Sequence, residues 1–236
     1  MLLFVDDRAP VTLVDSAVDT ADRSGSYTFA GLNFGDDFSN RTIVVIAHLV
    51  ATANNPINQT GCTIGGVSAA GDDAGDFGGS GTPVGAAGTG VWAAKPTGTS
   101  GSVVLSFASS AHAAAVYVFA VADLASATPF ASSVGDGAAG GITSDPNYPA
   151  SPSGTINIPN NASLGAVLIG GATRTSNTGA ITLSGITHQA YDVTLDGVHR
   201  IAGGFDYRLP QQTNRAIGFS TGSSNVLFAM RASSFS

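Results

Sequence analysis

The sequence contains no glutamate and a single lysine, Lys95, so aspartate and arginine supply nearly all of its charge. Only 11% of its 236 residues are charged, whereas about a quarter is usual for a soluble domain. Glutamate and lysine are good helix formers. In their place the chain has 31 glycines, and each glycine costs about 1 kcal/mol in a helix interior relative to alanine. A helical bundle is therefore close to excluded.

Other scarcities exclude classes of partner. The nine cationic residues are scattered and outnumbered by sixteen acidic ones, giving a net charge of −7, whereas nucleic-acid binding needs clustered Lys and Arg. Cys62 has no second cysteine to pair with. The longest apolar stretches, around 43–50 and 113–122, fall short of the roughly 20 residues that span a membrane. The apolar start of the chain is too short for a signal-peptide core. We expect no nucleic acid and no membrane among the partners.

Apolar and polar residues alternate with a period of two along most of the chain, which is typical of strands with one buried face. Phe205 and Tyr207 point one way while Asp206 and Arg208 point the other. Two segments, 43–46 and 116–119, are apolar on both faces and are predicted to be central strands of packed sheets. The pattern predicts an all-β protein, an antiparallel β-sandwich of jelly-roll type.

The two halves of the chain are weakly similar, which predicts two half-units built alike. Four pairs of segments match in the same order: 43–51 with 165–174, 63–67 with 182–186, 102–109 with 214–221, and 116–121 with 226–231. The halves cover about 26–125 and 150–236. Periodicity leaves open whether they form one jelly roll or two small sandwiches. We favour one domain over 26–236, because each half is short of large apolar residues. Residues 1–25 are expected to be an attachment arm.

Asp72, Asp73 and Asp76 form the densest polar cluster, within a glycine-rich segment. Their carboxylates could bind Ca²⁺, but the spacing is not that of an EF-hand and the bidentate Glu is absent. We therefore favour a solvated acidic loop. No other cofactor is indicated.

Catalytic patterns are scarce. The chain has no GxSxG elbow, no HExxH and no paired-cysteine metal motif, and we expect no enzyme. His48 is predicted to be a hydrogen-bonded residue of an apolar strand. His188 and His199 flank a turn and could approach each other across two strands, although two imidazoles make a weak metal site.

Aromatic side chains could stack on the apolar face of a sugar. Trp92 is the only tryptophan and begins a strand after a glycine-rich loop, so it is a candidate sugar platform; packing at a sheet end is the alternative. Tyr148, Tyr191 and Tyr207 are weaker candidates for the same role.

The turn and strand motifs at 41–45, 63–69 and 96–107 occur in an order that resembles a group of β-rich virion proteins of tailed bacteriophages and prophages. The first two are a buried strand and a "TIGGV" turn followed by small residues. The third is a "PTGT-SG" turn that leads into a valine-rich strand. The second half resembles the group as well, ending in a strand like that at 226–231. The resemblance covers about residues 26–236.

The resemblance implies a non-enzymatic component of the particle surface: a capsid decoration or cement protein, or a subunit of a head or tail fibre. Such a subunit is assembled in the bacterial cytoplasm and binds other virion proteins. Homo-oligomers are symmetric, and we expect a trimer. The alternative is a carbohydrate-binding adhesin of the tail, with contacts from Trp92, the tyrosines and the loop around Asp72.

If the acidic cluster is a solvated loop, removing Ca²⁺ will leave the thermal midpoint of unfolding unchanged. Differential scanning calorimetry with and without a chelator measures this, and the triple variant Asp72→Asn, Asp73→Asn, Asp76→Asn serves as the control. A large chelator-dependent drop in the unsubstituted chain that is absent from the variant would instead establish a calcium site.

Overall fold

The computed structural model describes residues 11–51, 57–74, 86–136, 153–160, 165–173, 179–221 and 228–236, and all of its regular structure is strand. The first half of the chain forms nine strands: β1 (Val11–Asp19), β2 (Arg23–Asn33), β3 (Thr42–Ala51), β4 (Gln59–Ile64), β5 (Val67–Ser68), β6 (Ala70–Ala74), β7 (Ala86–Ala94), β8 (Ser100–Ala111) and β9 (Ala113–Val121). The second half forms eight: β10 (Ala131–Asp136), β11 (Ser153–Asn160), β12 (Gly165–Thr173), β13 (Ile181–Ser184), β14 (His188–Thr194), β15 (Arg200–Leu209), β16 (Gln212–Thr221) and β17 (Phe228–Phe235). Within these residues, no helix is long and apolar enough to cross a membrane.

The first half folds into a jelly roll of two antiparallel sheets, β1-β9-β3-β7-β6 and β2-β8-β4-β5. The alternating strand β2 turns Tyr27 and Phe29 into the core between the sheets and leaves Thr28 exposed. The doubly apolar strands β3 and β9 lie inside the five-stranded sheet and are buried on both faces. The predicted antiparallel, all-β class is confirmed.

The second half repeats this strand order in sheets β10-β17-β12-β15-β14 and β11-β16-β13. In the five-stranded sheets, β10 corresponds to β1, β17 to β9, β12 to β3, β15 to β7 and β14 to β6. The segments matched in the sequence fall on strands that hold the same place in the two sheets: β3 and β12, β4 and β13, β8 and β16, β9 and β17. The prediction of two similar halves is therefore confirmed.

Two sequence-based expectations differ from the structure. Among the described strands, each half builds a sandwich of its own, so there are two sandwiches rather than one, and no sheet of these strands mixes the halves. Residues 11–19, expected to belong to an arm, form the edge strand β1 and pair with β9. Apolar residues of β1, such as Val11, are buried against the sheets, which is why this segment joins the fold. Residues 1–10 lie outside the described part of the chain.

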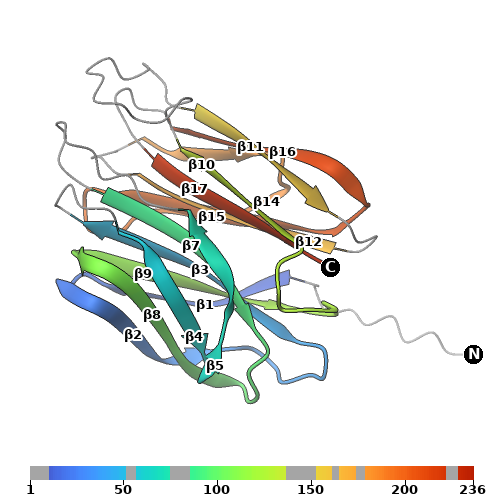
Figure 1. Cartoon of the computed structure of the whole chain (residues 1–236), viewed down its shortest axis with the longest axis horizontal. Coiled ribbons are helices and arrows are strands. Elements are labelled where there is room, and N and C mark those ends of the chain that lie inside the picture. The colour runs from blue at the N-terminus through green and yellow to red at the C-terminus, as the bar shows by residue number, and fades with distance from the viewer. Residues whose placement is uncertain are drawn as a thin grey trace, which may run out of the picture.

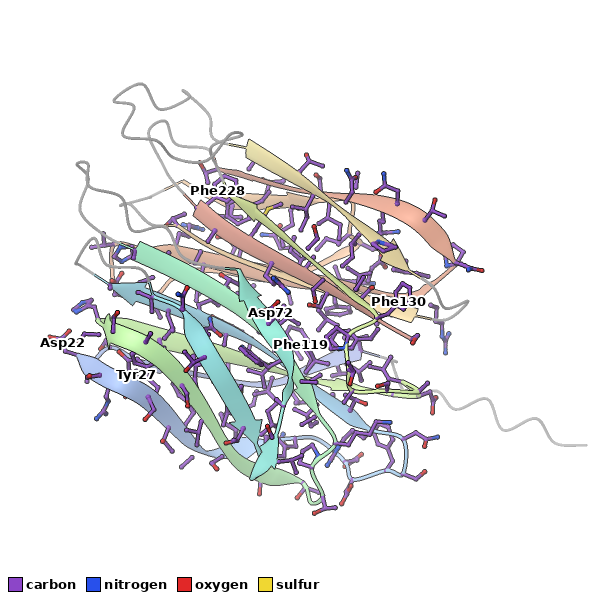
Figure 2. All side chains as sticks on the ribbon, viewed as in Figure 1. Asp22, Tyr27, Asp72, Phe119, Phe130 and Phe228 are labelled. Atoms are coloured by element: carbon purple, nitrogen blue, oxygen red, sulfur yellow. The ribbon has the colours of Figure 1, made fainter. Side chains whose placement is uncertain are left out.

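The two sandwiches pack through their five-stranded sheets, so that four sheets stack in layers with three cores between them (Figure 1). Figure 2 shows Tyr27 inside the first sandwich, Phe228 inside the second and Phe119 between the two. The middle core joins residues of both halves, among them Ile46, Leu168 and Ile201, all of which are fully buried. The two jelly rolls thus form one continuous body.

The middle core has an approximate twofold arrangement. Across the first sheet, Tyr117, Ile46, Val91 and Asp72 form one cross-strand row. Across the second sheet, the equivalent row is Arg231, Gly170, Gly203 and Tyr191. The ends of the rows meet in opposite order: Tyr117 stacks on Tyr191 and Asp72 bonds Arg231. Between these ends, Gly170 lies against Ile46. The twofold relation is limited to the ends of the rows, because β7 packs closely on β12 and β17 whereas its counterpart β15 does not pack in this way on β3 and β9.

Gly170 allows the sheets to approach at the centre of this arrangement. A Cβ at this position would lie 2.4 Å from Cγ2 of Ile46 and 2.8 Å from Cγ2 of Thr89. Both atoms belong to buried side chains of the opposite sandwich, held by the β3–β7 ladder. No larger residue fits here unless the sandwiches separate.

We predict that Gly170→Ala lowers the free energy of unfolding by about 1–3 kcal/mol, the usual cost of overpacking a core. The control is Gly61→Ala in β4, where an added Cβ meets nothing within 4 Å. Urea unfolding of both variants measures the difference. In an Ile46→Ala background the cost of Gly170→Ala should shrink, because the opposing methyl group is gone. Equal effects of the two glycine substitutions would contradict the close approach.

Candidate functional site

A buried polar network lies in the middle core and ties the two sandwiches together. His48 on β3 is fully buried; its Nδ1 is hydrogen-bonded to Oγ1 of Thr89 at 3.0 Å and its Nε2 to the hydroxyl of Tyr191 at 2.7 Å. Thr89 belongs to the first sandwich and Tyr191 to the second. Both ring nitrogens of His48 are thus satisfied, as a buried imidazole requires. The expectation of a hydrogen-bonded histidine in an apolar strand is confirmed.

Two stacked tyrosine rings, one of them the Tyr191 ring of this network, lie beside His48. Tyr117 and Tyr191 stack with ring centroids 3.4 Å apart and an angle of 4° between the planes. Burial raises the pKa of Tyr117 to about 12 and that of Tyr191 well above its ordinary value, and it lowers the pKa of His48 to about 3. All three groups are therefore neutral at pH 7. The network positions the sandwiches and contains no group charged for catalysis.

An ion pair links the sandwiches at the pseudo-equivalent place. Arg231 on β17 is buried and donates from Nη2 to Oδ2 of Asp72 on β6 at 2.9 Å, while the Asp72 side chain is 66% exposed. Figure 2 shows Asp72 between the two halves. Solvent screens a pair that is exposed on one side, so its contribution to stability is modest.

The proposed calcium ligands are only partly described. Asp72 bonds Arg231, Asp73 belongs to β6 with its side chain outside the description, and Asp76 lies outside the described residues. Among the residues that are described, no group of three or more His, Cys, Asp or Glu side chains could hold a metal ion. The expected solvated loop is wrong for Asp72 and Asp73, which lie in strand β6 because Ala70–Ala74 pairs with β7; calcium binding by the three aspartates is untested.

The candidate sugar platforms are not brought together. Trp92 packs in the core of the first sandwich at 6% exposure and donates from its ring nitrogen to Gln59. Tyr191 is buried in the middle core as described above, and Tyr148 lies outside the described residues. Trp92 lies near the end of β7 rather than at the start of a strand, and the alternative of packing at a sheet end agrees with the structure, because its ring nitrogen donates to a buried amide. Neither ring presents a face to solvent.

His188 and His199, which could have approached each other, have separate partners. His199 is buried in the β14–β15 turn, where its Nδ1 lies 2.6 Å from Oδ2 of Asp196. His188 is exposed and stacks on Phe205 and Tyr207 of the neighbouring strand. The sequence placed Phe205 and Tyr207 on one strand face. It gave no sign of their contact with His188, because that contact depends on the register between β14 and β15.

Two small sheets, β2-β8-β4-β5 and β11-β16-β13, form the outer faces of the stack. Among their described residues, the side chains that point outward from paired strand positions carry no charge. On the first sandwich these are Ser26, Thr28, Thr63, Ser102, Val104 and Ser106. On the second they are Thr155, Asn157, Thr182, Ser184, Ala216 and Ser220. Arg23 lies at the start of β2 and pairs with Asp19, and Arg215 of β16 pairs with Asp206. The stack of four layers therefore ends in two uncharged faces, one on each sandwich.

No protein-family model matches the chain, and no curated protein matches it. The solved structures include a match to the PBSX exported protein XepA, with 8% sequence identity and a TM-score of 0.22 over 95% of this chain and 86% of that chain. A likeness at this TM-score carries no argument about function.

The buried His48 predicts a pH dependence of stability. Its pKa is about 3 in the folded chain and about 6.5 when unfolded, so below pH 6.5 the unfolded state binds the proton first. The contribution of His48 to the free energy of unfolding is therefore fully present above pH 6.5. It falls by about 1.4 kcal/mol per pH unit as the pH drops toward 3. In urea unfolding between pH 7.5 and 5, we expect His48 to account for a loss of about 2 kcal/mol.

His48→Gln is the matched comparison, because glutamine can still bond Thr89 and Tyr191 but does not titrate. Other carboxylates and histidines titrate alike in both proteins, so the difference between the two pH profiles isolates His48. Parallel profiles would show that the imidazole is not buried in its neutral form.

Proposed function

We propose that the chain is a non-enzymatic structural subunit of a phage particle surface, acting through protein–protein contacts as a capsid decoration or cement protein or as a fibre subunit. The observation that carries this proposal is the pair of uncharged outer faces at the two ends of the stack. The resemblance of the sequence to virion proteins of tailed phages supplies the setting. Its place is the assembled virion, and its partners are other virion proteins.

The composition of these faces suits contact with protein rather than permanent exposure to water. Surfaces that keep soluble proteins apart are rich in interspersed charges, whereas the centres of protein interfaces are depleted in them. The outward side chains are short, so a neighbouring surface can approach the backbone closely. Hydroxyl groups such as those of Thr28 and Thr63 can bond across such a contact.

The continuous middle core makes the subunit suitable for this role. His48, Tyr191 and Ile46 connect the sandwiches through buried contacts, so the two outer faces are held at a fixed separation. A subunit with two fixed faces can bind neighbours at both ends. We propose that one neighbour is a second copy of the chain, in a trimer.

A carbohydrate-binding adhesin of the tail is the alternative. Trp92 and Tyr191 are buried and give it no support.

We expect the purified chain to self-associate and to bind particles that lack it. Charging one outer face should abolish this, because two lysines would be desolvated in the contact. The variants are Thr28→Lys with Thr63→Lys on the first face, and Thr155→Lys with Thr182→Lys on the second. Sedimentation equilibrium measures the oligomer, and co-sedimentation measures particle binding.

The control pair, Thr194→Lys with Val198→Lys, adds the same charge at the exposed β14–β15 turn. It should leave assembly unchanged. If neither face variant alters assembly, or if the control disrupts it equally, the outer faces are not the contacts. If the wild-type chain stays monomeric and does not bind particles, the proposed function is wrong.

A further inference from the structure

The two halves share a strand order but differ in where their strands shift register, and one such place is the ribbon of β14 and β15. In the first half the equivalent strands β6 and β7 pair without a shift of register. In the second half β14 has a bulge between Gln189 and Tyr191. A second bulge sets Tyr207 and Arg208 of β15 opposite a single residue of β12. The jelly roll itself therefore does not require these bulges.

The bulge on β15 holds Arg208 in a left-handed conformation, with φ of 52°. Such conformations in residues other than glycine are uncommon and cluster at functional sites, and bulges serve to re-aim side chains. Tyr207 is the side chain next to this bend.

Three aromatic rings stack on one another at the same place. The His188 ring is 5.0 Å from that of Phe205 and 5.5 Å from that of Tyr207, with angles of 21° and 10° between the planes. Phe205 and Tyr207 are 6.2 Å apart at 29°. His188 is exposed and the other two rings are half-buried. The three nearly parallel rings, which we call the aromatic rim, lie where the two sandwiches meet.

The aromatic rim rests on a rigid support. Phe205 contacts the buried Phe119 of the first sandwich edge-on, with centroids 5.7 Å apart. Phe205 and Tyr207 both pack against the middle core. Held in this way, the rings lose little conformational freedom when a ligand binds.

The aromatic rim also offers polar atoms. In the described part of the chain, no protein group is hydrogen-bonded to the Tyr207 hydroxyl, the His188 ring nitrogens or the Arg208 guanidinium. This differs from Tyr27 and Tyr191, whose hydroxyl groups are bonded within the protein. The aromatic rim thus combines ring surface with free donors and acceptors.

We propose that the aromatic rim of His188, Phe205 and Tyr207 binds a neutral oligosaccharide. The C–H faces of a pyranose stack on aromatic rings while its hydroxyls need donors and acceptors nearby, and the aromatic rim supplies both. The expected ligand is an oligosaccharide, because several linked sugars can contact the exposed His188 ring and the half-buried rings beside it. A nucleic acid would need clustered lysines and arginines. Among the three residues of the aromatic rim and the adjacent Arg208, only Arg208 is of this kind.

This proposal is independent of the contacts made by the outer faces. The opposing possibility is that the three rings only cover the end of the middle core. In that case substitutions of His188 or Tyr207 would change the stability of the fold and would not change the binding of any ligand.

The test uses the full chain with immobilised bacterial surface polysaccharides, and with soluble cellotetraose and chitotetraose as probes in NMR titrations. We expect retention on at least one polysaccharide and shifts of the His188 imidazole resonances with a bound probe. Tyr207→Ala and His188→Ala should each weaken binding about fivefold to tenfold, the value of one lost ring contact. Tyr207→Phe should retain most of the binding if stacking dominates.

His112→Ala is the matched control, because His112 is a second histidine near the surface, bonded to Asp22. It should leave binding unchanged. Thermal midpoints of all variants exclude loss of folding as the cause. Absence of binding to every glycan, binding unaffected by both alanine variants, or preferential binding of a proline-rich peptide or of single-stranded DNA would each overturn the proposal. These results would leave the assembly experiments unaffected.

Discussion

The close approach of β3 and β12 is the constraint on which the rest of the structure depends. Ile46 occupies the space that a side chain at Gly170 would take, so the two five-stranded sheets meet tightly enough to exclude water. Only then can His48 reach Tyr191, and Arg231 reach Asp72, across the boundary. Buried polar groups without partners would be costly there, so packing and hydrogen bonding fix the same relative position of the two sandwiches.

The two end contacts of this interface occupy equivalent places in the two halves, yet they differ chemically. On one side two tyrosine rings stack beside a neutral histidine. On the other a buried arginine meets a half-solvated aspartate. A covalently joined pair of similar units can differ in this way, because each half needs to fit only the other. The same freedom allows β14 and β15 to carry bulges that β6 and β7 lack.

Several charged residues in the described part of the chain lie at edges, turns and the boundary of the sandwiches. Arg41, for example, is buried and donates to carbonyl oxygens of two separate loops, including those of Asp36 and Gly98. Arg200 pairs with Asp192 within the β14–β15 ribbon. Because so many arginines serve as internal ties, the outer faces are left to serine, threonine and asparagine.

The strand class, the repeated order of strands and the doubly buried segments can be predicted from the amino-acid sequence, because alternation and apolar runs are local properties of the chain. The sequence could not determine how the two halves meet, since Gly170 looks like any other strand glycine until Ile46 is opposite it. The sequence match of 116–121 with 226–231 identified the correct strands but not their register. In the structure Arg231 is equivalent to Tyr117, whereas the match aligned it with Val121. Trp92 and Tyr191 looked available for a ligand, whereas burial decided otherwise. His188, Phe205 and Tyr207 came together only through the register of two bulged strands, and register is set by tertiary packing.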